Sequence, residues 1–239
     1  MLGRFLEISI HAPAIRDSLE FYESLGFVQA RVGETWPHPY GVVTDGRLYI
    51  GLHGAPVQSP ALTFVLPDLV HGIERLRQLG IQFEQELLND DVFNQALFRD
   101  PQGYSVNVLE ARTFSPPLLD SPVMTSCGYF AELGLPCKDV EAAQRYWEAL
   151  GFVALESQSE PFPRTPLTSD LLNIGLYRTR ALRQPVLTFE DRDMQQRLAR
   201  LRERGYQVSD EMPDTLAETS NGVLIAPEGT RLLLLQSED

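Results

Sequence analysis

Apolar and polar residues alternate at the start of the chain in a way that predicts a strand. In residues 5–11 the apolar side chains alternate with Glu7, Ser9 and His11, so the strand has one apolar and one polar face. An amphipathic helix is expected next, and Gly26 marks its end. Glu7 is the first candidate functional residue, because its carboxylate lies in the middle of a strand whose neighbouring residues are suited to a buried core.

The same pattern returns about 125 residues later. The tripeptide Leu-Gly-Phe closes the first helix of each copy, at residues 25–27 and 150–152, and a Pro-x-Gly turn recurs at residues 101–103 and 227–229. Glu132 occupies the place in the second copy that Glu7 occupies in the first. Many matches in one order indicate an internal duplication.

Each half is predicted to contain two βαβββ units, which gives an α+β protein. Hairpin signals support this, above all Asp45-Gly46 between two apolar runs. The expected domains are residues 1–112 and 127–239, and residues 113–126, which are rich in proline, form the linker between them.

Composition narrows the class of partner. Of the 239 residues 43% are hydrophobic, enough for a sizeable core, and the net charge is -13, which argues against nucleic acid or an anionic membrane. The pattern predicts neither a signal peptide nor a membrane-spanning helix. The two cysteines, Cys127 and Cys137, are expected to be free and buried, which predicts a reducing cytoplasm as the location. The expected oligomeric state is a monomer or a homodimer.

The first helix and the turn before the last strand of the first half carry a family resemblance. The signature consists of Ser18, Phe21, Tyr22, Leu25, Gly26 and Phe27, together with the turn Asp100-Pro101-x-Gly103. It resembles the vicinal oxygen chelate superfamily, which includes glyoxalase I, bleomycin-resistance proteins and extradiol dioxygenases. The resemblance implies two tandem glyoxalase-like domains whose curved mixed sheets enclose clefts.

In metal-using members of that superfamily, strands aim ligands into the cleft. Carried over to this chain, the ligand positions fall on Glu7, Gly51, Ala61 and Asn107 in the first half and on Glu132, Gly175, Val186 and Leu233 in the second. Because few of these side chains can ligate a metal, the expectation is no cofactor and a metal-independent binder of a small organic molecule.

The alternative left open by the resemblance is a lyase, isomerase or dioxygenase that uses a divalent metal. In that case Glu7, His53 and Asn107 would converge on the ion, because His53 lies two residues beyond Gly51 on the same strand face. Catalytic residues are not assigned, and a scaffold that has lost its ligand is a third possibility.

The ligand-binding candidates are polar or aromatic residues expected to face a cleft. They are Glu7, Ser9, His11, Trp36, Tyr40, His53, Thr63, Asn107 and Glu132. Each has an ordinary explanation as well: the carboxylates pair with arginines, the histidines are solvated at strand ends, and the aromatic residues pack their own loop. His38, between two prolines, is as readily a loop residue as a cover for a ligand.

Overall fold

The computed structural model describes residues 2–32, 36–89, 94–111 and 123–237. The first half contributes eight strands and two helices within these ranges. They are β1 (Arg4–His11), α1 (Ile15–Ser24), β2 (Val28–Ala30), β3 (Tyr40–Thr44), β4 (Tyr49–His53), β5 (Ala61–Leu66), α2 (Leu69–Gln78), β6 (Phe83–Leu87), β7 (Gln95–Arg99) and β8 (Ser105–Glu110).

The second half repeats this order with one strand fewer among the described residues. Its elements are β9 (Tyr129–Pro136), α3 (Val140–Ala149), β10 (Val153–Ala154), β11 (Arg164–Thr168), β12 (Asn173–Tyr177), β13 (Val186–Asp191), α4 (Met194–Glu203), β14 (Gly222–Ile225) and β15 (Arg231–Gln236).

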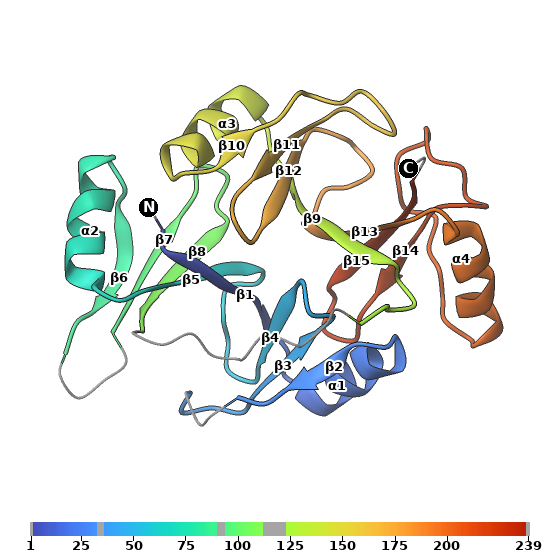
Figure 1. Ribbon diagram of the computed structural model, residues 1–239, viewed down its shortest axis with the longest axis horizontal. Helices are drawn as coiled ribbons and strands as arrows, with labels where there is room; N and C mark the ends of the chain where they lie inside the picture. The colour runs from blue at the N-terminus through green and yellow to red at the C-terminus, as the bar shows by residue number, and fades with distance from the viewer. Residues whose placement is uncertain (1, 33–35, 90–93, 112–122, 238–239) are drawn as a thin grey trace.

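Each half forms one mixed sheet, so the two units of a half pair with each other (Figure 1). The strand orders are β2-β3-β4-β1-β5-β8-β7-β6 and β10-β11-β12-β9-β13-β15-β14. In both sheets the first strand of the half runs parallel to one hairpin strand and antiparallel to the first strand of the next unit. The predicted tandem α+β architecture is confirmed.

The two sheets differ at one edge. In the described part of the second half, the segment between α4 and β14 does not form a strand that would be the counterpart of β6. Its pairing with the sheet is limited to the isolated β-bridge between Ser209 and Val223. This segment instead sends Met212 and Leu216 into a buried cluster over the sheet. The two halves therefore share the central strands of the sheet and differ in the segment at one edge, which is a strand in the first half and a loop in the second.

Local chemistry explains where the helices begin and end. The carboxylates of Asp68 and Asp139 each accept a hydrogen bond from a backbone N–H in the first turn of the following helix. Gly26 and Gly151 follow the first helix of each half with φ of +100° and +106°, a conformation that glycine adopts without a Cβ clash.

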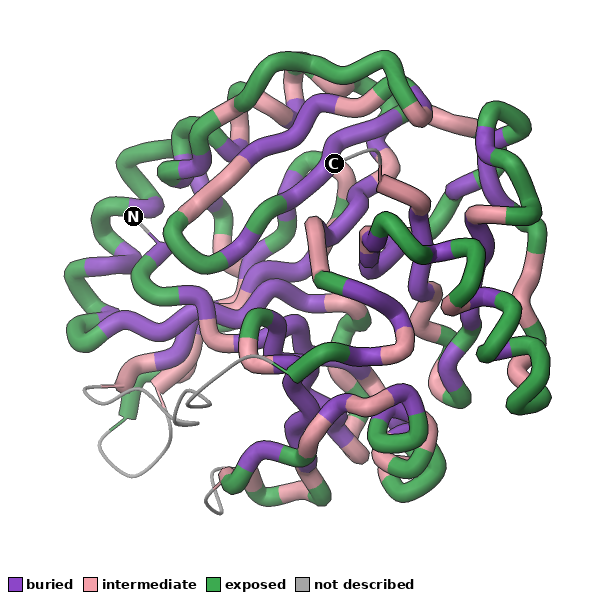
Figure 2. The backbone as a smooth tube through the Cα atoms, turned by 45° about the vertical axis from the view of Figure 1, so that its right-hand side comes forward, coloured by how far each residue is buried: buried purple, intermediate pink, exposed green. Residues whose placement is uncertain are grey.

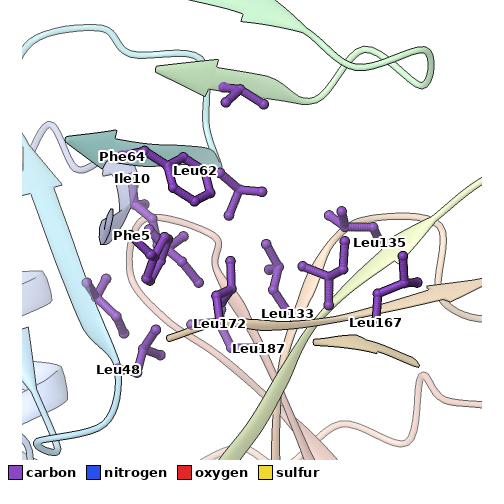
Figure 3. Packing of buried hydrophobic residues seen from close by; sticks show 14 of the residues in the cluster. Phe5, Ile10, Leu48, Leu62, Phe64, Leu133, Leu135, Leu167, Leu172 and Leu187 are labelled. Carbon is purple, nitrogen blue, oxygen red and sulfur yellow. The ribbon is translucent and has the colours of Figure 1, made fainter. Parts of the chain in front are cut away.

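The two halves share one hydrophobic core. Leucines of β9 and β13 pack with residues of β1 and β5, as Figure 3 shows for Leu133, Leu187, Ile10 and Leu62. Buried positions follow the strands of both sheets, whereas exposed positions follow the connecting loops and the outer helix faces (Figure 2). Burial of this continuous apolar surface is what holds the halves together.

A polar contact fixes the same interface. Ser18 Oγ and Tyr22 Oη of α1 donate to the two carboxylate oxygens of Glu228 in the second half, at 2.7 and 2.8 Å. Two residues of the signature in the first helix therefore bind the opposite half. The side chains of Cys127 and Cys137 are free and buried, and burial raises the pKa of the Cys127 thiol to about 12.

The described residues leave the predicted domain boundaries untested. Most of the predicted linker, residues 113–126, lies outside them, so the domain boundaries at 112 and 127 stay predictions. Among the described helices, none has the length and apolar character needed to cross a membrane.

Candidate functional site

The first-half sheet borders a cavity of about 910 Å³. Within the described part of the chain its lining contains no aspartate, glutamate, lysine or arginine. Uncharged polar groups and aliphatic side chains share the wall, with an aromatic and imidazole group at one side. The polar members are Ser9, Gln58, Thr63, Gln85, Gln95, Ser105 and Asn107, and the ring-bearing members are Trp36, His38 and His53.

Glu7 lies fully buried behind this wall and accepts hydrogen bonds at both carboxylate oxygens. Ser9 Oγ donates to Oε1 at 2.7 Å, the Tyr40 hydroxyl donates to Oε2, and His53 Nε2 lies 3.0 Å from Oε1. A Cβ on Gly51 would lie 2.1 Å from Glu7 Oε1, so glycine in this strand leaves the space that the carboxylate fills.

The hydroxyls beside Glu7 form a directed chain. Because the single Ser9 proton points to Glu7, Ser9 Oγ must accept from Thr63 Oγ1, which lies 2.7 Å away. Burial and the neighbouring Glu7 carboxylate raise the pKa of Tyr40 far above its ordinary value, so its hydroxyl keeps the proton that it donates. Ser9 and Tyr40 therefore each present a hydrogen to the carboxylate, and Thr63 donates to Ser9.

His53 connects the buried carboxylate to the aromatic loop. Its Nδ1 lies 3.0 Å from His38 Nε2, and the Trp36 ring packs against both imidazoles with centroid separations of 5.2 and 5.5 Å. The Tyr40 ring packs on His53 at 4.7 Å. Burial, and secondarily the neighbouring His53, lower the pKa of His38, which favours its neutral form.

The structure brings most of the candidates together. Glu7, Ser9, Tyr40, His53 and Thr63 form one hydrogen-bonded group. Trp36 and Asn107 line the cavity beside that group. These residues therefore lie together in the structure, and their role in binding stays a prediction.

Two candidates lie elsewhere. His11 lines a separate cavity between the halves, together with residues such as Leu187 and Thr230. Glu132 lies in the second half, buried beside Arg164, whose Nε is 3.7 Å from the Glu132 Oε1. Desolvation raises the pKa of Glu132, and Arg164 partly offsets this. The ordinary explanation, a carboxylate paired with an arginine, therefore applies to Glu132.

Sequence reasoning did not commit to His38, although this residue joins the hydrogen-bonded group. The signal was its place between two prolines in an aromatic loop, which holds the backbone and restricts the ring. The glycines of the repeated Ile-Gly-Leu motif were a second unused signal. Gly51 and Gly175 each leave room for the glutamate on the neighbouring strand, where an added Cβ would lie 2.1 and 2.2 Å from it.

The equivalent space in the second half is filled by its own side chains. Tyr177 and Phe162 pack edge to face, with centroids 5.6 Å apart, and the cluster around them also contains Met212, Leu216 and Leu233. A Cβ on Gly134 would lie 2.8 Å from the Tyr177 ring, so this ring covers the strand where Ser9 stands in the first half.

The fold family implies a metal, which needs about three protein ligands. At the carried-over positions of the second half only Glu132 is a donor, and the Arg164 guanidinium beside it disfavours a cation. In the first half both Glu7 oxygens and both His53 ring nitrogens are already hydrogen-bonded to protein groups. Among the described residues no group of three histidine, cysteine or acidic side chains is arranged to hold an ion. As arranged, these residues do not fit a three-ligand metal site.

The fold matches solved dioxygenase structures along nearly the whole chain. A catechol 2,3-dioxygenase structure matches with a TM-score of 0.61 at 14% identity, covering 97% of this chain and 86% of that one. A variant of homoprotocatechuate 2,3-dioxygenase from Brevibacterium fuscum gives 0.61 at 15% identity, covering 99% and 72%. The 2,2',3-trihydroxybiphenyl 1,2-dioxygenase of Sphingomonas wittichii strain RW1 gives 0.60 at 16% identity, covering 98% and 90%.

No protein-family model matches the sequence, and no curated protein matches it. The structural matches confirm the resemblance to the vicinal oxygen chelate superfamily at the level of the fold. They also correct one expectation. The expectation of no cofactor is wrong, because the proteins that share this fold are extradiol dioxygenases, which use iron or another metal.

Proposed function

We propose that this chain, which has the fold of the vicinal oxygen chelate superfamily, binds a small organic molecule in its first-half cleft. The observation that carries the proposal is the cavity of about 910 Å³ beside the Glu7–His53 contact. Its size falls within the range of about 300–1,000 Å³ that is usual for small-molecule sites. The register-matched space in the second half is closed by apolar side chains.

The lining indicates an uncharged ligand. Hydroxyl and amide groups of Ser9, Thr63, Ser105 and Asn107 supply donors and acceptors on one wall. Since the described lining contains no cationic side chain, a carboxylate or phosphate on the ligand would have no partner of opposite charge. Trp36 supplies a flat apolar surface that suits a planar molecule.

The test is a screen of neutral aromatic and heteroaromatic fragments by melting temperature. A ligand that binds only the folded state raises the Tm with its concentration. Binding should be lost in Asn107→Leu, which narrows the cavity, and retained in Leu233→Met, which changes the matched position of the second half. Hits that Asn107→Leu leaves unchanged, or no hits at all, would overturn the proposal.

The alternative function is a lyase, isomerase or dioxygenase reaction that depends on a divalent metal. It requires Glu7, His53 and Asn107 to turn to a common point, which means breaking the 3.0 Å contact between Glu7 and His53. Metal analysis of the purified protein, with and without added Fe²⁺, Mn²⁺, Ni²⁺ or Zn²⁺, tests it. Stoichiometric metal that is lost in Glu7→Gln would establish this alternative.

A further inference from the structure

A second cavity, of about 490 Å³, lies between the two halves and is called the inter-half cavity below. Its apolar wall includes Ile10, Leu133 and Leu187, which come from both halves and belong to the shared core (Figure 3). The described lining contains no phenylalanine, tyrosine, tryptophan, arginine or lysine. A small molecule with a saturated apolar body suits these aliphatic walls. The polar members of the lining are His11, Ser59, Gln184, Glu228 and Thr230.

Glu228 is held at this cavity by two hydroxyls of the opposite half. Ser18 Oγ donates to Oε2 at 2.7 Å, and Tyr22 Oη donates to Oε1 at 2.8 Å. Burial, and then the charge of Glu228, raise the pKa of Tyr22 well above its ordinary value, so the phenol keeps the proton that it donates. Both of these partners are neutral, so they orient the carboxylate without balancing its charge, and each oxygen retains a further lone pair.

The duplication contains a filled counterpart of this cavity. The repeated Pro-x-Gly turns are followed by Tyr104 in the first half and by Thr230 in the second. Tyr104 packs against the core, and its hydroxyl donates to the carbonyl oxygen of Pro136 at 2.7 Å. Pro136 ends β9 as His11 ends β1. The threonine therefore leaves open, beside the end of β1, a space that a tyrosine ring fills in the counterpart.

The middle residue of the same turn differs in charge. Gln102 in the first half accepts a hydrogen bond from the backbone N–H of Lys138 through Oε1, at 3.0 Å. Glu228 brings a carboxylate to the matched position in the second half. The position that is open is thus also the one that carries a negative charge, in a protein whose net charge of -13 attracts cations.

We propose that the inter-half cavity binds a small aliphatic ammonium ion. Glu228 is the counter-ion, and the side-chain oxygens of Gln184 and Ser59 are further acceptors for the ammonium hydrogens. The apolar body of the ligand occupies the space that Tyr104 fills in the counterpart. This site is distinct from the first-half cleft, since Val57 is the one residue that the described linings of the two cavities share.

The experiment compares cyclohexylmethylamine with cyclohexylmethanol, which has the same saturated body and no charge. At pH 8 the aliphatic amine is protonated. Calorimetric titration should show that the amine binds about tenfold more tightly than the alcohol, as expected for a charge-assisted hydrogen bond. The amine should also raise the Tm with its concentration, because the cavity exists only in the folded protein.

Variants that exchange the matched residues locate the site. Glu228→Gln gives the cavity the side chain of Gln102, so it should keep the alcohol and lose the preference for the amine. Thr230→Tyr gives it the side chain of Tyr104 and should lose both probes; circular dichroism and urea unfolding confirm that this variant folds. Gln102→Glu is the matched control, because it adds a carboxylate where the space is already filled, and it should leave the affinity for the amine unchanged.

The outcomes are decisive in each case. A preference for the amine that survives Glu228→Gln, or binding that persists in folded Thr230→Tyr, would place the ligand elsewhere and overturn the inference. Equal affinities for the two probes, or no binding of either, would overturn it as well. The first-half cleft is tested independently, since none of these variants changes a residue that lines it.

Discussion

The two halves of this protein place different side chains on matching strands. Tyr40 and Arg164 begin equivalent strands, and each lies beside the glutamate of its own half, but only Arg164 brings a charge. His53 is matched by the larger Tyr177, whose ring covers Gly134. One cleft stays open and hydrogen-bonded, whereas the other is filled.

The difference extends to the strands that form the far wall. In β5 and β8 the cleft positions are Ala61 and Asn107, and the strands of the second half place Val186 and Leu233 there. Small or polar residues leave volume, while branched apolar residues fill it and add to the core. The two copies of the fold therefore differ in open volume: one sheet borders a cavity, and the other adds these side chains to the core.

The largest expected effect comes from truncating the matched pair Leu233 and Asn107. Leu233→Ala should lower the free energy of unfolding by about 2–5 kcal/mol, because it opens a cavity in a filled cluster. Asn107→Ala should change it by less than about 0.5 kcal/mol, since that side chain already borders empty space. Urea unfolding measures both, and equal losses would mean that the two clefts are packed alike.

A smaller loss, common to both halves, is expected at the strand glycines. Gly51→Ala and Gly175→Ala should each cost about 1–3 kcal/mol, because the new methyl group would lie 2.1 or 2.2 Å from a glutamate oxygen. Gly41→Ala is the control, since its Cβ would meet Leu19 at an ordinary 3.4 Å.

A double-mutant cycle with Glu7→Ala sharpens this prediction. If the clash is the cause, Gly51→Ala should cost much less in the Glu7→Ala background than in the wild type. Additive losses, measured by the same urea unfolding, would show that the glycine is needed for another reason.

The next effect concerns pH and the buried carboxylate of the second half. The folded state raises the pKa of Glu132 above its ordinary value of 4.5, chiefly by desolvation. The folded protein then holds the proton more tightly than the unfolded chain, so the contribution of Glu132 to stability is present below pH 4.5 and is lost as pH rises through the folded pKa.

Glu132→Gln removes this dependence. The stability of the variant relative to the wild type should increase as pH rises above 4.5, by at most about 1.4 kcal/mol per pH unit. Arg164→Met should extend the window upward, because Arg164 lowers the pKa of Glu132. Glu141→Gln, at an exposed position in the same half, is the control variant. A pH-independent difference in unfolding free energy would contradict the prediction.

The smallest effect on stability is expected when the first cleft is given the side chains of the second. The double variant Ala61→Val with Asn107→Leu should unfold within about 0.5 kcal/mol of the wild type, because it adds apolar groups to open space. It should nevertheless lose the rise in Tm that neutral aromatic fragments give with the wild type. Retained affinity would place the ligand elsewhere.

The sequence by itself determined the repeated pattern, the helix ends and the hairpins. Alternation in residues 5–11, the Leu-Gly-Phe exits and the Asp45-Gly46 turn are local signals, and local backbone physics is enough to interpret them. Glu7 and Glu132 were visible as matched carboxylates for the same reason.

Only the tertiary structure decided what those carboxylates meet. Glu7 meets Tyr40 and His53 while Glu132 meets Arg164, and each partner comes from a strand far along the chain. Whether a cleft is open depends on volumes that several strands and a loop contribute together. No short stretch of sequence determines the total side-chain volume in a cleft, because packing depends on neighbours in space.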